Sequence, residues 1–292
     1  MKFSIITPIY NRADIIKETL PHILNQDFDE YEVIVVDDGS TDNTWDVLQS
    51  ISHDKLRIFR KENGERGAAR NYGAKQASGE YLNFFDCDDI MYPNHLKTAW
   101  ELITSHPDEK LFHVCYDFRD ASEQLLSHVQ IPKEGTAKHL PYNNFLACNT
   151  VFVQRDAFLS NPFSENRVLS TAEDWELWLR LVSRYNIIGT DERTFAIIEH
   201  AGRSLNTIAP EKVEQRNLLL NQLLKNDAPF NKYYRQESSF FYAHNLAYIA
   251  LIFAENDSLK NRARQYLKAA IKEYKLIVFN KRFLAALKNS IL

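Results

Sequence analysis

The first ninety residues alternate between short apolar segments and amphipathic segments, and this alternation constrains the fold more than any other feature. The apolar segments are rich in β-branched and aromatic residues, which predicts strands over 2–7, 31–36, 56–59 and 81–85. Apolar residues at helical spacing predict helices between them, over 14–24, 44–51 and 68–77. Pro8 has no N–H group to donate, so we expect the first strand to end before it. Strands and helices that alternate through short loops predict an α/β fold with a mostly parallel, helix-covered sheet.

Polar side chains follow three of the predicted strands. Tyr10 and Asn11 come after the first, Asp37 and Asp38 after the second, and an aspartate cluster after the fourth. Ligands of such sheets bind at the carboxyl ends of the strands, so these positions form the candidate site. The chain contains neither Gly-x-Gly-x-x-Gly nor Gly-x-x-x-x-Gly-Lys-Ser/Thr. This argues against a dinucleotide-binding dehydrogenase and against a P-loop ATPase.

The aspartate cluster consists of Asp86, Asp88 and Asp89. Crowded carboxylates repel one another, so the fold needs a divalent cation, an arginine cluster or a helix cap to hold them together. Asp89 or Asn94 could cap a helix that begins near His95. Capping requires one such residue, and the cluster has three. The sequence therefore favours a metal or nucleotide site, with Asp89 starting the next helix.

The remaining chain is less regular and then becomes helical. Residues 92–206 predict helices over 95–105 and from 175 to 182, and strands over 110–118, around 150–153 and over 194–199. Residues 121–143 are polar and predict loops with a hairpin. Apolar periodicity then predicts helices over 213–224, 238–255, 260–274 and 281–292. We expect an α/β domain over 1–207, divided into halves 1–90 and 91–207, and an all-helical extension over 208–292.

Composition limits the cellular context. The three cysteines are scattered without metal-binding spacing, which predicts a reducing compartment. No secretory leader is recognisable, and no apolar run approaches the ~20 residues of a membrane span. These features predict a cytoplasmic protein. From residue 260 onward, nine Lys or Arg residues face one acid, within a chain of net charge −4. This basic tail indicates an anionic partner or a solvated helix face.

Four motifs together carry a family resemblance. They are the loop Thr7–Asn11, the segment Val36–Asp42 (Val-Asp-Asp-Gly-Ser-Thr-Asp), the Asp-x-Asp-Asp segment Phe85–Asp89, and the Glu-Asp element Ala172–Arg180. In this order and spacing, over roughly residues 1–205, the chain resembles the family 2 inverting glycosyltransferases with the GT-A fold, a Rossmann-like α/β fold. Residues 1–90 then correspond to the nucleotide-binding half and residues 91–207 to the acceptor and catalytic half. The helical extension lies outside the resemblance.

The resemblance implies roles for the polar strand ends. Asp88 would ligate a divalent cation, Mn²⁺ or Mg²⁺, and Asp86 would contact both that ion and the nucleotide-sugar. Asp38 would accept a hydrogen bond from the base, most simply uracil N3–H. Tyr10 would stack on the base, with Pro8 and Asn11 shaping the pocket. Asp37 either belongs to this site, like Asp38, or forms the turn that follows the strand.

The Glu-Asp element supplies the candidate catalytic base. Similarity to the family favours Asp174 over Glu173, although a carboxylate in the first turn of a helix is also explained by capping. Trp175 is either part of an acceptor platform or, like Trp178, part of the core. His200 is either a polar residue near the diphosphate or a structural histidine.

Two arginines precede the aspartate cluster. Arg70 and Arg66 are placed to meet phosphate, and a surface salt bridge is the alternative for each.

These residues lead to a functional hypothesis. We expect an inverting transferase that moves a sugar from a nucleotide-sugar to a glycan or lipid-linked acceptor in cell-surface polysaccharide biosynthesis. The expected nucleotide-sugar is a UDP-sugar. The basic tail over 260–292 would place it peripherally on the cytoplasmic face of a membrane. A metal-dependent nucleotidyltransferase is an alternative, but it needs a Gly-rich basic loop where residues 8–12 stand. A non-catalytic binding protein on the same fold is another. No nucleic-acid partner is expected, and the sequence leaves the oligomeric state open.

Overall fold

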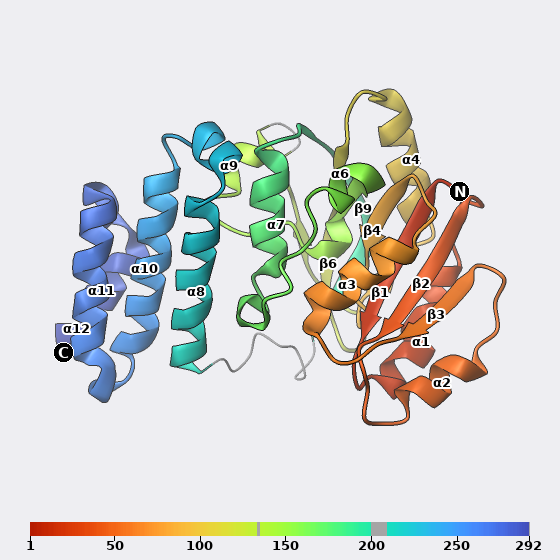
Figure 1. The fold of residues 1–292 in the computed structure, drawn as a ribbon, viewed down its shortest axis with the longest axis horizontal. Coiled ribbons are helices and arrows are strands. Elements are labelled where there is room, and N and C mark those ends of the chain that lie inside the picture. The colour runs from red at the N-terminus through yellow and green to blue at the C-terminus, as the bar shows by residue number, and fades with distance from the viewer. Residues whose placement is uncertain (133–134, 200–208, 292) are drawn as a thin grey trace. The chain divides into compact units, whose positions relative to one another are not determined.

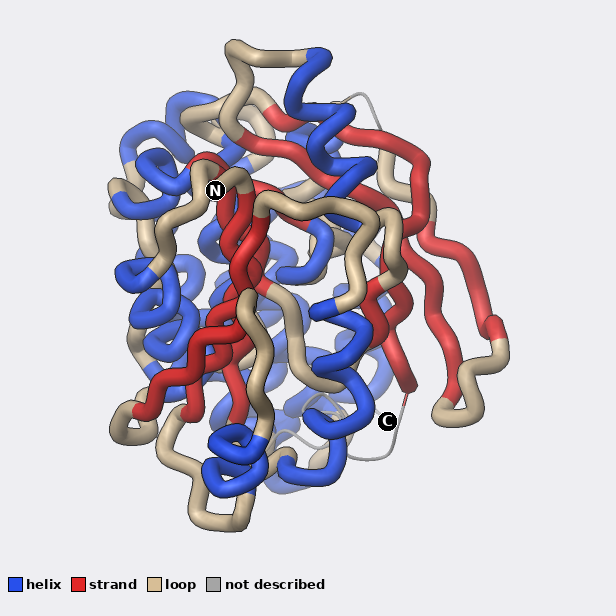
Figure 2. Tube along the Cα trace, turned by 90° about the vertical axis from the view of Figure 1, so that its right-hand side faces the viewer, coloured by secondary structure: helices blue, strands red, loops and turns tan. Residues whose placement is uncertain are grey.

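The computed structural model describes residues 1–132, 135–199 and 209–291, whose course Figures 1 and 2 show. The chain forms two compact units. The first unit contains the sheet and the helices that cover it. The second contains the C-terminal helices together with the short segments Pro141–Asn143 and Val168–Ala172.

The N-terminal half of the sheet is parallel, as predicted. Its strands pair in the order β3-β2-β1-β4 and comprise β1 (Phe3–Ile9), β2 (Tyr31–Asp37), β3 (Leu56–Arg60) and β4 (Tyr81–Phe84). The connecting helices are α1 (Ala13–Leu24), α2 (Thr44–Ser50) and α3 (Glu65–Gln76). Strands β1, β2 and β4 are buried throughout, as expected for strands covered on both faces. A Cβ on Gly73 of α3 would lie 2.5 Å from Ile6, so glycine is what lets α3 approach the sheet closely.

Pro8 does not end the first strand, contrary to the prediction. Strand β1 continues to Ile9, and Pro8 stays in register with Val36 of β2. The carbonyl of Ile6 accepts a hydrogen bond from Phe85 on the β4 side, and that of Ile9 accepts one from Asp38 on the β2 side. Because backbone groups alternate sides, Pro8 faces the β4 side, where the ladder has already ended at Ile6 and Phe84. The missing N–H therefore costs the sheet no hydrogen bond.

The rest of the sheet is mixed, with antiparallel pairs beside the parallel ones. Strand β8 (Val151–Gln154) pairs antiparallel with β4 and with β6 (Leu111–Asp120). Strand β9 (Ile187–Glu199) runs parallel to β6 and antiparallel to the short β5 (Ile90–Met91). Strand β7 (Leu125–Val129) forms the hairpin predicted in the polar region by pairing with β6. Strand β9 begins earlier than predicted because its first part, around Thr190 to Arg193, is polar and lacks the apolar alternation used for the prediction.

Four helices accompany these strands. They are α4 (His95–Ser105), α5 (Thr136–His139), α6 (Arg155–Leu159) and α7 (Glu173–Val182). Short 3₁₀ turns are η1 (Cys148–Thr150) and η2 (Arg167–Leu169). Helix α7 buries one apolar face, with Leu177, Trp178 and Leu181 fully inside the protein. That burial fixes the first turn of α7, where the Glu-Asp element lies.

The second unit is helical, with elements α8 (Pro210–Lys225), α9 (Ala228–Tyr233), α10 (Ser238–Ala254), η3 (Asp257–Leu259), α11 (Lys260–Glu273), η4 (Lys275–Phe279) and α12 (Lys281–Ile291). Helix α10 is buried on nearly all sides because α11 and α12 pack around it through a shared apolar core. Helix α9 was not predicted, although Asp227 caps it by accepting from the N–H of Phe230 at 2.8 Å. That Asp, followed by Pro229 in the first turn, is a recognisable start signal.

No helix among the described residues combines the length and the apolar composition needed to cross a bilayer.

Candidate active site

The polar strand ends gather at one edge of the first unit. Strands β1, β2 and β4 are parallel neighbours, so the residues that follow them emerge together at their carboxyl ends. Tyr10 follows β1 and is 44% exposed, which leaves an aromatic face open at this edge. Asn11 has a left-handed backbone with φ of 51°. Its side-chain oxygen accepts from the N–H of Thr41 at 2.8 Å, so Asn11 ties the loop after β1 to the loop after β2.

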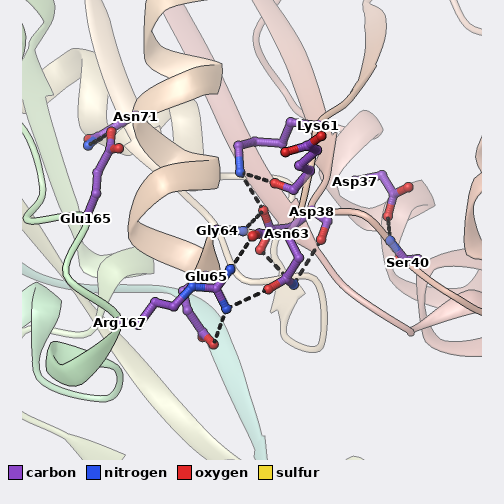
Figure 3. Close-up of polar contacts among 11 residues, drawn as sticks. Asp37, Asp38, Ser40, Lys61, Asn63, Gly64, Glu65, Asn71, Glu165 and Arg167 are labelled. Atoms are coloured by element: carbon purple, nitrogen blue, oxygen red, sulfur yellow. Dashed lines mark hydrogen bonds and ion pairs between the residues drawn. The ribbon is translucent and has the colours of Figure 1, made fainter.

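Asp38 is buried and organises the neighbouring loop, as Figure 3 shows. Its Oδ1 accepts from Lys61 Nζ at 2.8 Å and from the N–H of Gly64 at 2.9 Å. Its Oδ2 accepts from Asn63 Nδ2 at 3.2 Å. A carboxylate oxygen can accept two hydrogen bonds, so Oδ2 retains capacity for one more donor. The sequence did not reveal the roles of Lys61 and Asn63. Lys61 donates to one oxygen of the Asp38 carboxylate, and Asn63 donates to the other.

Asp37 forms the turn, as its alternative interpretation held. Its Oδ1 accepts from the N–H of Ser40 at 3.0 Å, and its Oδ2 lies 3.1 Å from Arg60 Nε. Gly39 between them has φ of 74°, and a Cβ there would meet the Asn63 nitrogen at 2.9 Å. The turn therefore requires glycine, because an L side chain would be strained and would push the Asn63 loop away.

The aspartates after β4 form a compact oxygen cluster. One carboxylate oxygen each of Asp86, Asp88 and Asp89 lies within 4.8 Å of the others. Such a set of hard oxygen ligands, without imidazole or thiolate, fits Mg²⁺ or Mn²⁺. Cys87 lies between them in sequence but is buried, and burial raises the pKa of its thiol well above the usual value. The buried thiol therefore stays protonated near neutral pH.

Asp89 does not cap the next helix, and that prediction was wrong. Helix α4 begins after Asn94, which makes no side-chain cap hydrogen bond. The carboxylate of Asp89 accepts from Asn149 Nδ2 at 2.7 Å and from the N–H of Ile198 at 3.1 Å. Asp89 turns inward because β9 and η1 offer buried donors that need an acceptor.

Asn149 is a positioning residue that the sequence did not reveal. Its Oδ1 accepts from the backbone N–H of Asp86 at 3.0 Å, while its Nδ2 donates to Asp89. It is fully buried. One amide group thus holds both ends of the aspartate cluster, and a single buried asparagine carries no sequence signature of such a role.

Arg70 is fully buried rather than exposed to a phosphate. Its two terminal nitrogens reach Asp86 Oδ1 at 2.6 Å and Glu173 Oε1 at 2.9 Å. The guanidinium also lies over the ring of Phe163, 5.3 Å from its centroid. Arg66 Nε lies 3.8 Å from the same Glu173 carboxylate, and its side chain is 33% exposed. Arg66 is therefore the more accessible cation of the two, and Arg70 serves as a link between carboxylates.

Asp174, the candidate base, lies half-buried in the first turn of α7. Burial, followed by the charge of Glu173, raises the pKa of its carboxyl to about 7, against the opposing effects of Arg70, the Trp175 N–H and Asn144. Its Oδ1 accepts from the N–H of Trp175 at 2.6 Å. A carboxylate whose pKa lies near neutrality is suited to accept a proton during catalysis.

The two tryptophans of α7 differ. Trp178 is fully buried and donates from Nε1 to the carbonyl of Leu146 at 2.9 Å, so it belongs to the core. Trp175 is half-buried and donates from Nε1 to the carbonyl of Leu140 at 2.8 Å, which fixes the orientation of its ring. His200 lies outside the described residues.

A second contact joins the segment before α7 to the loop at Asp38. Arg167 Nη1 donates to Asn63 Oδ1 at 3.0 Å and lies 3.8 Å from Glu65 Oε1, as drawn in Figure 3. Deeper in the protein, Asn71 Nδ2 donates to Glu165 at 2.9 Å. These bonds fasten Glu165 and Arg167 to α3 and to the loop before it.

Comparison with known proteins agrees with this geometry. The chain is 29% identical over 241 residues to an uncharacterized glycosyltransferase of Rickettsia bellii, covering 80% of this chain but 34% of that protein. It therefore spans about a third of the length of that relative. It is also 29% identical over 254 residues to the UDP-Glc:alpha-D-GlcNAc-diphosphoundecaprenol beta-1,3-glucosyltransferase WfaP of Escherichia coli, covering 83% of this chain and 92% of WfaP.

Solved structures support the fold. The crystal structure of S. aureus TarS 1–349 in complex with UDP-GlcNAc matches with a TM-score of 0.66 at 22% identity, covering 95% of this chain and 90% of that one. This likeness confirms the predicted GT-A fold. The family model for glycosyl transferase family 2 matches residues 4–161, which contain the strand ends and the aspartate cluster. This chain belongs to glycosyl transferase family 2.

Proposed function

We propose that this chain is an inverting glycosyltransferase that moves a sugar from a UDP-sugar to a hydroxyl group of a glycan or lipid-linked acceptor during cell-surface polysaccharide biosynthesis. The observation that carries the proposal is the chain of ion pairs from Asp86 through Arg70 to Glu173. It links the aspartate cluster to the residue adjoining the candidate base. Family membership and the glucosyltransferase activity for which WfaP is named support the same reaction class.

The donor would bind at the carboxyl ends of β1, β2 and β4. Asp86 and Asp88 would hold Mn²⁺ or Mg²⁺, which neutralises the diphosphate and stabilises it as a leaving group. Uracil presents N3–H between two carbonyl oxygens. Asp38 would accept that N–H, while Lys61 beside it gives two of its three donors to Asp38 and to the Glu62 carbonyl and can donate the third to a uracil carbonyl. The exposed ring of Tyr10 would stack on the base, with Pro8 and Asn11 below it.

The acceptor would react at Asp174. Its carboxylate would take the proton from the acceptor hydroxyl as that oxygen bonds to the anomeric carbon, while the bond to the diphosphate oxygen breaks on the opposite face. The configuration inverts in a single displacement, without a covalent enzyme intermediate. Glu173 is paired with Arg70 and adjoins Asp174, and its charge helps to raise the pKa of the Asp174 carboxyl, which favours proton uptake by Asp174. A lipid-linked acceptor would bring this reaction to the cytoplasmic face of a membrane.

The proposal is tested by measuring UDP release from a panel of UDP-sugars with Mn²⁺ or Mg²⁺, in the presence of lipid-linked and free glycan acceptors. We expect acceptor-dependent UDP release that EDTA abolishes. Asp174→Asn should abolish transfer and leave UDP binding intact. Asp156→Asn, in the exposed first turn of α6, is the matched control and should keep full activity. If Asp174→Asn transfers sugar at the wild-type rate, Asp174 is not the base. Absence of donor turnover under every condition would refute the proposed reaction.

A further inference from the structure

The last part of the second unit carries an unbalanced positive charge. From residue 260 onward the sequence contains nine Lys or Arg residues and one acid, Glu273. That acid is already paired with Lys225 of α8. Among the described residues no ion pair is formed by five exposed lysines, Lys268, Lys272, Lys275, Lys281 and Lys288. The basic tail therefore presents a cationic surface rather than a network of salt bridges.

Helix α12, which carries the C-terminal end in Figure 1, is apolar on two sides. One side is buried in the core of the unit through Phe283 and Ala286. The side next to it is exposed, with Leu284 at 50%, Leu287 at 38% and Ile291 at 68%. These three residues recur at i, i+3 and i+7, so they form one stripe along the helix. These three residues extend the apolar surface of α12 beyond the part that its own unit covers.

Lysines border this stripe. Lys281 and Lys288 are one heptad apart and exposed, and at 3.6 residues per turn they lie along the edge of the stripe away from the core. The preceding turn η4 adds Leu276, 59% exposed, and Phe279, 77% exposed. Residues three apart in a 3₁₀ turn lie on one side, so these two side chains point the same way. We call residues 275–291 with these exposed side chains the basic apolar face.

We propose that the basic apolar face docks on the surface of an anionic lipid bilayer. Exposed leucine, isoleucine and phenylalanine side chains gain free energy when they enter the boundary between headgroups and acyl chains, and flanking lysines are attracted by anionic headgroups. A second copy of the chain is a poorer occupant, because its identical face would bring like charges together. The contact would hold the enzyme at the surface where a lipid-linked acceptor resides. It does not rest on the proposed transfer reaction, because docking needs no turnover.

Vesicle flotation tests this contact with the complete chain. We expect it to float with phosphatidylcholine vesicles that contain phosphatidylglycerol and to remain behind with phosphatidylcholine alone. Lys281→Gln and Lys288→Gln should each lower the binding constant roughly fivefold, since a lysine near an anionic surface contributes that much attraction. The triple variant Phe279→Ser, Leu284→Gln, Leu287→Gln should lower it at least about tenfold by removing insertable apolar area. Wild-type flotation by these variants would overturn the proposal.

Matched controls lie on the same unit. Leu218→Gln in α8 removes a leucine that is 40% exposed, and Lys232→Gln in α9 removes an exposed lysine. Both should float like the wild type. Unchanged circular dichroism and UDP binding in all variants would show that folding and the donor site are intact. Sedimentation velocity distinguishes the other occupant: a dimer that the triple variant dissociates would mean that a second copy covers the face, and the lipid proposal would be wrong.

Discussion

Arg70 spans the distance between Asp86 and Glu173, which are 87 positions apart in the sequence, with ion pairs of 2.6 Å and 2.9 Å. The first carboxylate belongs to the candidate metal cluster and the second adjoins the candidate base. Since Arg70 is 1% exposed, its charge is compensated by these two partners and by the ring of Phe163. The two halves of the proposed reaction are thus joined by one side chain.

Arg70→Met should destabilise the protein strongly. Removal of one partner from a buried ion pair leaves an uncompensated charge and costs about 3–5 kcal/mol of unfolding free energy. Urea denaturation followed by circular dichroism measures this cost. Arg66→Met is the matched control, because its partly exposed side chain lies 3.8 Å from Glu173, and its cost should be about 1 kcal/mol or less. Equal costs for both variants would show that Arg70 does not link the two carboxylates.

The rate of transfer should depend on the protonation of Asp174. A general base works only when ionised, and the pKa of this carboxyl is about 7. We expect log kcat/KM to rise with unit slope below pH about 7 and to level off above it. The pH dependence of UDP release measures this profile. A rate that stays flat down to pH about 5 would contradict the assignment, since an ordinary aspartate would remain ionised there.

Asp174→Asn should lower activity while preserving or raising stability. The pKa of Asp174 is raised above that of an unfolded aspartate, so its stabilising contribution is present below pH about 4 and is lost as the pH rises through about 7. An amide at position 174 does not ionise, so the variant does not lose this stability as the pH rises. Urea midpoints at pH 8 should therefore be equal to or above wild type, and the difference should shrink at pH 5. A variant that is less stable than wild type at pH 8 would show that the ionised carboxylate supports the fold.

Substitutions at Asp88 and at Asp89 should have different effects. The first should weaken metal-dependent UDP binding, and the second should lower the stability of the fold. Asp88→Asn should weaken Mn²⁺-dependent UDP binding at least about tenfold by removing a charged ligand, with little change in stability. Asp89→Ala should cost about 1–3 kcal/mol of unfolding free energy, because Asn149 and the Ile198 N–H lose their buried acceptor. Calorimetric titration with UDP, with Mn²⁺ and with EDTA, and urea denaturation measure the two effects. Unchanged metal-dependent affinity in Asp88→Asn would argue against a metal role for Asp88.

Asp38 should determine how strongly the affinity for UDP depends on the N3–H group of uracil. UDP methylated at N3 cannot donate a hydrogen bond, so its affinity for the wild type should fall roughly tenfold, the value of a hydrogen bond to a charged group. In Asp38→Asn the penalty for methylation should shrink, because the carboxylate acceptor is gone. Competition against UDP measures both penalties in one double-mutant cycle. An identical methylation penalty in the two proteins would place the base elsewhere.

Local patterns predicted much of the first unit. The alternation of apolar and amphipathic segments was sufficient for β1 to β4 and their helices, because each is specified by its own residues. The same residues could not predict that Arg70 would face Glu173, because that pairing depends on how α3 and α7 pack. The prediction that Pro8 ends the first strand was wrong because the β1–β4 ladder stops before Pro8. The length of β4 is not evident from the residues around Pro8. Asp89 was misjudged because its donors, Asn149 and Ile198, come from distant strands and turns.

The amide of Asn149 has a consequence for anyone who would move this site to another scaffold. It binds the backbone of Asp86 and the side chain of Asp89 at once, and so acts as a clamp on the turn that carries the acids. A transplanted Asp-x-Asp-Asp segment without such a clamp would have only mutual repulsion to shape it and would open before any ion arrived. A transplanted site therefore needs both the acidic turn and the asparagine, which in this sequence is Asn149, 63 positions after Asp86.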